Sequence, residues 1–221
     1  MKKIKVRFSV ALLLTALAIA FTIAVKTVDI KPALNGTEIG FSTINYFFFN
    51  KVGVHLVWYT ITDWLGILPV LLAFSYAVLG LIEWIKRKNV LKVDKEILVL
   101  GVFYIVIFFL YFFFEKVIIN YRPVLIDGFL EASYPSSHTL ITVCISVSSI
   151  LISKKIFAQN IAKILNIVCY AVIAITVVGR FISGVHWLTD IIGGLLIASA
   201  LLSLFYAVLS SLNNNDNIKK V

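Results

Sequence analysis

A chain of 221 residues that is 61% hydrophobic and only 14% charged, with a mean hydropathy of +1.00, has the composition of a membrane protein. Soluble domains carry about 25% charged residues, so the composition argues against a soluble fold. The net charge of +9 would suggest a nucleic-acid partner in a soluble protein. Here the basic residues lie in short clusters between apolar runs, which indicates membrane topology and no nucleic-acid binding.

Six apolar stretches have the length of a membrane-spanning helix, which needs about 20 residues. The fold class is therefore all-α, an integral membrane bundle of about six transmembrane helices in a single domain. The polar end of the chain is predicted to be a flexible tail. The predicted helices cover residues 8–25, 64–85, 97–114, 138–153, 161–178 and 188–209, and the tail covers residues 213–221.

The first apolar stretch has two interpretations. Four basic residues precede it, and Ala16-Leu17-Ala18 resembles the cleavage site of a signal peptide. However, the apolar run is long for a signal peptide and continues past that site. We therefore favour an uncleaved anchor.

The basic residues also predict the orientation of the helices. With the N-terminus in the cytoplasm, 14 of the 20 lysines and arginines fall in inner segments. Positive charge is enriched in cytoplasmic loops, so both termini are predicted to be cytoplasmic in a multi-pass protein of the cell membrane.

The first outer loop, residues 26–63, is long and rich in aromatic residues, including Phe47-Phe48-Phe49, Trp58 and Tyr59. Aromatic residues beside a membrane span usually lie at the level of the lipid headgroups. A lid over a site on the outer face is an equally good interpretation. His55, in the same loop, is interpreted as an interfacial histidine.

Polar residues of chemical interest collect in two outer segments. The first contains Lys116, Arg122-Pro123 and then Pro135-Ser136-Ser137-His138, and the second contains Arg180, His186 and Asp190. Ionisable residues at membrane depth are costly and are therefore candidates for function. Both segments map to the outer face in the topology drawn from charge counts, with the site facing outward.

These residue types suit phosphate chemistry. Arg122 and Arg180 carry permanently charged guanidinium groups, which can bind two phosphate oxygens at once, and Lys116 adds a point charge. Ser136 and Ser137 precede an apolar helix, so a serine cap with free N–H groups at the positive helix end would form an anion site.

Two histidines and an aspartate suit nucleophilic catalysis. His186 and Asp190 are four residues apart, which places them on one helix face. Asp190 can then hold one imidazole nitrogen and leave the other as a nucleophile. His138 can protonate a leaving alcohol.

Together, Lys…Arg-Pro, Pro-Ser-x-His and Arg-x5-His-x3-Asp resemble the three-part signature of the type 2 phosphatidic acid phosphatase superfamily, the lipid phosphate phosphatases. The resemblance is close over residues 116–190. It implies His186 as the nucleophile of a phosphohistidine intermediate, oriented by Asp190, with His138 as general acid. It also implies that phosphate is bound by Arg122, Arg180 and the backbone of Ser136 and Ser137, and that no metal or other cofactor is used.

The sequence departs from this signature at three positions. Glu115 stands where the family has its lysine, Ser137 replaces a glycine, and Gly179 replaces a serine before Arg180. One residue on a helix is a rotation of about 100°, so Lys116 is a doubtful phosphate ligand. Either the backbone changes register before Arg122, or Glu115 pairs with one of the arginines, and we slightly favour the second.

The sequence therefore predicts a metal-independent membrane lipid phosphatase whose partners are the bilayer and its lipid substrate. Polyprenyl diphosphate, phosphatidic acid and phosphatidylglycerol phosphate are the candidate substrates. A lipid phosphotransferase using the same site and a non-catalytic lipid-binding or transport module are the alternatives. Lipid specificity and oligomeric state stay open.

Overall fold

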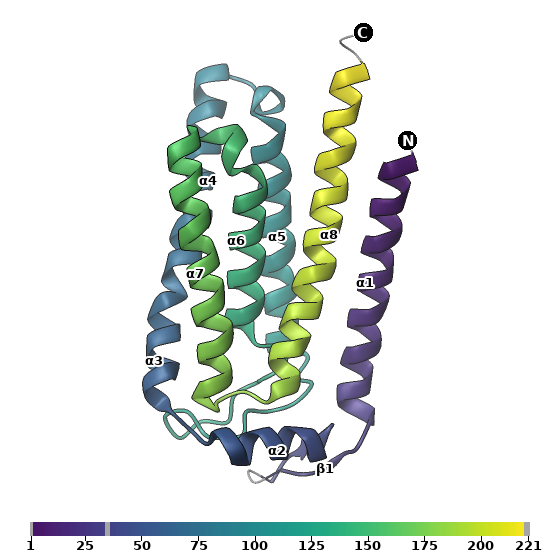
Figure 1. Ribbon diagram of the computed structural model, residues 1–221, viewed down its shortest axis with the longest axis vertical. Coiled ribbons are helices and arrows are strands. Elements are labelled where there is room, and N and C mark those ends of the chain that lie inside the picture. The colour runs from purple at the N-terminus through teal and green to yellow at the C-terminus, as the bar shows by residue number, and fades with distance from the viewer. Residues whose placement is uncertain (1, 34–35, 219–221) are drawn as a thin grey trace.

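The computed structural model describes residues 2–33 and 36–218, with side chains described as far as residue 214 (Figure 1). Within this part of the chain, six helical segments are long and apolar enough to cross a membrane, which confirms the predicted all-α bundle. The spans are α1 (Lys2–Thr27), α3 with α4 (Leu56–Leu65 and Ile67–Arg87), α5 (Lys95–Lys116), α6 (Ser137–Ile156), α7 (Gln159–Ser183) and α8 (Leu188–Ile218).

The second span begins earlier than the sequence predicts. Residues 56–63 were assigned to the outer loop, but they form α3, which packs along α7 and joins α4 at Gly66. Thr60, Thr62 and Asp63 make this segment look like a loop in sequence. Thr60 and Thr62 each donate a hydroxyl hydrogen bond to a backbone carbonyl of the preceding turn, which lets polar side chains remain in a helix.

Helix α8 continues to Ile218, so residues 213–218 are helical, whereas the sequence places them in a polar tail. The first residue of this extension is tied to α6, where Lys155 Nζ donates a hydrogen bond of 2.8 Å to Asn213 Oδ1. Lys155 also pairs with Glu96 of α5 at 2.5 Å. The remaining predicted tail, residues 219–221, lies outside the described part of the chain.

Helix α6 is the most buried of the spans and packs against α7 and α8. Its buried face is rich in small hydroxyl residues, which let neighbouring helices approach closely and form hydrogen bonds inside the bundle. Ser149 Oγ lies 2.7 Å from the hydroxyl of Tyr76 on α4, and Ser153 donates a bond of 2.9 Å to Asn166 of α7. The helix that begins at the Ser-Ser-His motif is therefore held from several sides.

The N-terminal end of α1 and the C-terminal end of α8 lie at one end of the bundle, and the described elements between α1 and α3 lie at the other (Figure 1). Strands β1 (Lys31–Pro32) and β2 (Glu38–Ile39) pair in antiparallel register, with Lys31 opposite Ile39. Helix α2 (Ser42–Val52) lies across the end of the bundle (Figure 1). At the end with the termini, η1 (Val90–Lys92) connects α4 to α5.

Helix α2 is fixed to the start of α8. Asn45 donates a hydrogen bond of 3.0 Å to the Thr189 hydroxyl and accepts one of 3.2 Å from the Thr189 N–H. The Trp187 ring packs against Tyr46 and Phe49, with centroids 5.3 and 5.5 Å away. The aromatic residues of α2 thus support the turn that carries the histidine and aspartate of the third motif.

Candidate active site

A polar cavity of about 510 Å³ lies at the end of the bundle that holds the motifs. It opens between α3, the end of α5, the start of α6 and the connection between α5 and α6. Tyr59 and Asp63, from the segment that the sequence assigns to the first loop, line it, whereas no described α2 side chain does. The lining residues of chemical interest are Tyr59, Asp63, Glu115, Arg122, Glu131, Ser133, Ser137, His138 and His186.

His186 lies in the short turn between α7, which ends at Ser183, and α8, which begins at Leu188. Its side chain is buried, and within the described residues Nε2 has no hydrogen-bond partner. Burial, with a smaller contribution from the nearby Arg122 guanidinium, lowers the pKa of His186 from 6.5 to about 4, against the opposing effect of the Asp190 carboxylate. The imidazole is therefore neutral at pH 7 and keeps a lone pair for nucleophilic attack.

Asp190 lies behind His186 and is fully buried. Its Oδ2 is 3.7 Å from His186 Nδ1, which is too long for a direct hydrogen bond. Instead Asp190 accepts hydrogen bonds from the Ser133 hydroxyl at 2.5 Å, the Trp187 N–H at 2.8 Å and Asn120 Nδ2 at 2.9 Å. The spacing of four residues does bring the two side chains together, as the sequence predicts, but a serine from another segment lies between them.

His138 occupies the first turn of α6 and faces the carboxylate of Asp63. Nε2 of His138 is 3.1 Å from Asp63 Oδ1, and the same oxygen accepts a hydrogen bond of 3.0 Å from Arg180 Nη2. A side chain at Gly66 would come within 2.9 Å of His138 Cδ2, so the bare backbone between α3 and α4 makes room for the ring. Asp63 thus connects the predicted general acid to a predicted phosphate ligand.

The two arginines come from different elements, and of the two it is Arg122 that lines the cavity. Arg180, on α7, is fully buried, and Arg122, in the α5–α6 connection, pairs with Glu131 at 3.2 Å. The ring of Tyr59 lies near both, with its centroid 5.0 Å from the Arg180 guanidinium carbon and 5.7 Å from that of Arg122. Arg122 brings positive charge into the cavity that His186 also lines, and Arg180 adds charge from its buried position next to Asp63, which favours a phosphate group there.

The serines of the second motif lie at the N-terminus of α6, as predicted, but Ser136 makes different hydrogen bonds from those expected. Ser136 does not cap α6 with its side chain, because its hydroxyl accepts a hydrogen bond from Thr139. Its N–H donates to the Asp190 carbonyl at 3.0 Å, so this group is not free to bind an anion. Ser137, by contrast, lines the cavity at the N-terminus of α6. Ser136 is thus the N-cap residue of α6, as predicted, but its side chain makes no capping hydrogen bond, and its backbone fixes α6 to α8.

Glu115 lines the cavity, whereas Lys116 Nζ lies 5.5 Å from the centroid of the Phe112 ring on its own helix. Helix α5 ends at Lys116, so the helix does not continue to Arg122. The carboxylates seen beside the arginines are Asp63 and Glu131. A pairing of Glu115 with an arginine stays a prediction.

The sequence analysis missed Asp63, Asn120, Glu131 and Ser133. Asp63 carried a usable signal, because a carboxylate at the start of an apolar span is costly and suggests a partner. Asn120 and Ser133 are ordinary loop residues in sequence. Among the described residues, no group of three histidine, cysteine, aspartate or glutamate side chains is placed to hold a metal ion.

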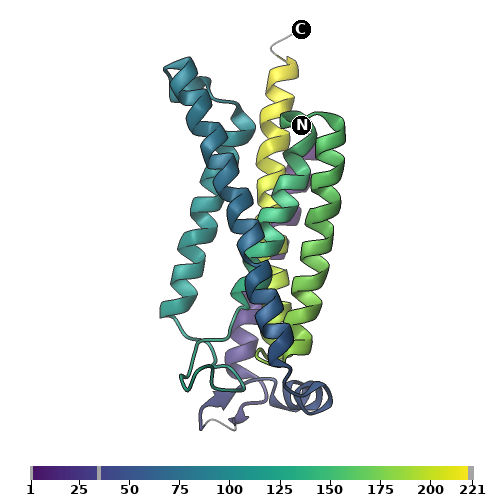
Figure 2. The ribbon, with the colours of Figure 1, turned by 90° about the vertical axis from the view of Figure 1, so that its left-hand side faces the viewer.

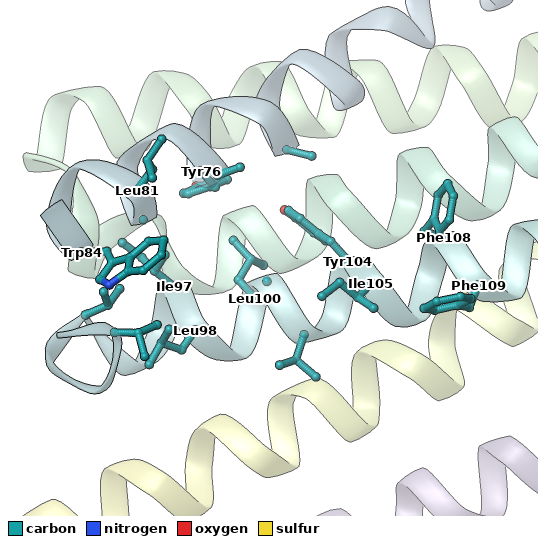
Figure 3. Close-up of a pocket in the computed structure, with 17 residues that line it drawn as sticks. Tyr76, Leu81, Trp84, Ile97, Leu98, Leu100, Tyr104, Ile105, Phe108 and Phe109 are labelled. Carbon is teal, nitrogen blue, oxygen red and sulfur yellow. The ribbon is translucent and has the colours of Figure 1, made fainter.

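An apolar groove extends from the polar cavity along α4 and α5. A cavity of about 180 Å³ shares Tyr111 with the polar cavity, and it shares Ala73, Tyr104 and Phe108 with a larger apolar cavity of about 830 Å³. Figure 3 shows the larger cavity, with side chains of both helices directed into it. At the end that holds the termini, α4 and α5 lie on one side of the molecule, away from α7 and α8 (Figure 2). The apolar cavities therefore follow α4 and α5 away from the polar cavity, toward the end that holds the termini.

The bundle of six spans, with a histidine and arginine cavity at one end, defines the class of this protein as a multi-pass membrane protein with the fold of a lipid phosphatase. A sequence profile described as the PAP2 superfamily matches residues 97–213, and the chain belongs to this superfamily. The structure resembles that of the first transmembrane PAP2 type phosphatidylglycerolphosphate phosphatase from Bacillus subtilis, with a TM-score of 0.63. The two sequences are 16% identical, and the match covers 91% of this chain and 96% of the other. A comparison with curated proteins gave no significant match.

Proposed function

We propose that the protein hydrolyses a phosphate monoester or diphosphate of a membrane lipid through a phosphohistidine intermediate. The observation that carries this proposal is the Nε2 atom of His186. It is buried, has no partner among the described residues, and belongs to a side chain that lines a cavity shared with Arg122 and His138. A neutral imidazole in this setting can attack a phosphorus atom as a nucleophile.

The first half-reaction transfers the phosphoryl group to the enzyme. The His186 Nε2 lone pair attacks phosphorus, a P–N bond forms, and the P–O bond to the lipid breaks. His138 donates a proton to the leaving oxygen, so the lipid departs as an alcohol or, from a diphosphate, as a monophosphate. Arg122 and Arg180 stabilise the charge on the phosphoryl oxygens.

The second half-reaction restores the enzyme. A water molecule gives a proton to His138 and attacks phosphorus, the P–N bond breaks, and inorganic phosphate leaves. His138 thus serves as acid in the first step and as base in the second. Asp190 keeps the His186 ring oriented in both steps.

The apolar groove supports a lipid substrate over a soluble phosphate ester. It begins at the catalytic cavity and is lined almost entirely by apolar side chains of α4 and α5. We assign it to the hydrocarbon chain of the substrate, which would enter sideways from the bilayer while the phosphate reaches His186. Polyprenyl diphosphate, phosphatidic acid and phosphatidylglycerol phosphate all have this shape, and the last is the substrate named for the similar Bacillus subtilis structure.

Phosphate release by the purified protein, measured across these three lipids, tests the proposal. We expect His186→Ala to abolish turnover and His138→Ala to slow formation of the phosphoenzyme, because loss of one such group costs several orders of magnitude. His55→Ala is the matched control, since His55 bonds to the Val52 carbonyl outside the cavity. Near-normal activity in His186→Ala would show that the mechanism is wrong.

Two outcomes would favour the alternatives. Release that depends on an added lipid or sugar alcohol, with little transfer to water, indicates a phosphotransferase. Binding of the lipids without any release indicates a non-catalytic module.

The groove has its own test. Ala73→Trp places a large ring where the two apolar cavities meet, and Leu71→Trp, on the exposed side of α4, is the control. Ala73→Trp should slow hydrolysis of long-chain phosphatidate and spare a short-chain analogue. Equal effects on both substrates would place the chain elsewhere.

A further inference from the structure

The hydroxyl of Ser133 lies between the side chains of His186 and Asp190. Ser133 Oγ is 3.1 Å from His186 Nδ1 and 2.5 Å from Asp190 Oδ2, whereas the direct distance from Nδ1 to Oδ2 is 3.7 Å. All three side chains are buried. Because hydrogen bonds are strongest at low local dielectric, this arrangement has more influence on the histidine than the longer direct contact.

The hydrogens of this group can be counted. A carboxylate only accepts hydrogen bonds, so the single hydroxyl hydrogen of Ser133 goes to Asp190. Ser133 Oγ then has only lone pairs to offer to His186, so Nδ1 must carry the imidazole hydrogen. Nε2 is left with the lone pair, and Nε2 is the buried atom without a partner among the described residues.

Ser133 is itself held in place by the α5–α6 connection. Its backbone N–H donates a bond of 3.0 Å to the Asn120 carbonyl, and the Asn120 side chain donates a bond of 2.9 Å to Asp190 Oδ1. The neighbouring pair Tyr121 and Ala132 forms an antiparallel bridge across the same connection. The segment between the first two motifs thus orients the serine and the aspartate together.

We propose that Ser133 is a positioning residue, which transmits the orienting effect of Asp190 to His186 and thereby selects Nε2 as the atom that attacks phosphorus. This inference rests on the proposed function for its chemistry. It assigns a role to a residue that lies outside the three motifs.

Removal of the hydroxyl should leave the substrate site intact and disturb the nucleophile. In Ser133→Ala the His186 ring has no bonded partner on its Nδ1 side unless it moves toward Asp190, and a misplacement of about 1 Å can cost on the order of 100-fold in rate. We expect kcat to fall by about 10- to 100-fold while KM changes little. Ser133→Thr keeps the hydroxyl and should recover most of the activity.

The test compares Ser133→Ala, Ser133→Thr and a control, Ser199→Ala, whose exposed hydroxyl bonds within α8. Phosphoenzyme formed from a ³²P-labelled lipid is quenched in base, and the phosphorylated nitrogen is identified. The wild type should carry phosphate on Nε2, and Ser133→Ala should form less phosphoenzyme, part of it on Nδ1. Wild-type kcat with Nε2 phosphorylation alone in Ser133→Ala would overturn the proposal.

A second measurement does not need turnover. Nitrogen NMR of histidine-labelled protein reports which His186 nitrogen carries hydrogen. The wild type and Ser133→Thr should show hydrogen on Nδ1, and Ser133→Ala should show a mixture of the two tautomers. If the wild type releases no phosphate but the tautomer responds in this way, the proposed function fails and the positioning role stands. An unchanged tautomer in a folded Ser133→Ala protein refutes the positioning role.

Discussion

The contact between α3 and α7 gives a sharp prediction, because it has no room for a side chain at Gly179. A Cβ atom there would lie 2.5 Å from Thr62 Cγ2 and 3.1 Å from Trp58 Cε3. Ordinary contacts begin at 3.4 Å, so Gly179→Ala requires the Thr62 methyl group to move by about 0.9 Å. Because Thr62 is fully buried, we expect the two helices to separate by a distance of this order. The serine that the family signature has at this position would meet the same obstacle.

The expected cost follows from what lies next to the contact. Overpacking of this kind destabilises a protein by about 1–3 kcal/mol. Thr62 precedes Asp63, and Gly179 precedes Arg180, so the separation would lengthen the Asp63–Arg180 bond from 3.0 Å to about 3.9 Å. We expect phosphate release to fall on the order of 100-fold, since a shift of about 1 Å in a positioning contact has that effect.

Thermal unfolding in detergent and phosphate release from mixed micelles measure the two effects. Gly101→Ala is the matched control, because nothing lies within 4 Å of a Cβ at that position on α5. The double variant Gly179→Ala with Thr62→Ser lacks the clashing methyl group and keeps the hydroxyl, so it should recover stability and activity. If Gly179→Ala has wild-type stability and activity, or if Thr62→Ser gives no recovery, the reasoning is refuted.

Four further predictions concern charge and sidedness. With the other two histidines replaced, His186 should titrate in nitrogen NMR with a pKa of about 4, so stability should rise with pH from about 4 to 6.5; a value of 6 or more would contradict its burial. Activity should persist in excess EDTA because arginines supply the charge that meets phosphate, and a loss restored by magnesium would count against this. After replacement of the native cysteines, a cysteine at Leu125 should react with an impermeant thiol reagent in intact cells and one at Asn89 should not; the reverse pattern would invert the topology. Lys116→Ala should lower activity less than about tenfold and Arg122→Ala far more, since only Arg122 lines the cavity, and equal losses would return Lys116 to the phosphate site.

The membrane bundle was predictable because its signals are local. A run of about 20 apolar residues identifies a span wherever it lies, and the fold has the six predicted spans. The placement of the motifs at one end, opposite the termini, also follows from counting spans. His186 and Asp190 are near each other in sequence, so their spacing was enough to bring them together.

The tertiary structure decided how the site is held together, because those contacts join residues that are distant in sequence. Asp63 and Arg180 are hydrogen-bonded although they are 117 residues apart in sequence, and Ser133 and Asp190 although they are 57 residues apart. No periodicity or spacing encodes such pairs. They exist because α3 packs on α7 and because the α5–α6 connection is hydrogen-bonded to Asp190 at the start of α8. The sequence by itself therefore determined the spans and the reactive groups, whereas packing determined which carboxylates and hydroxyls orient them.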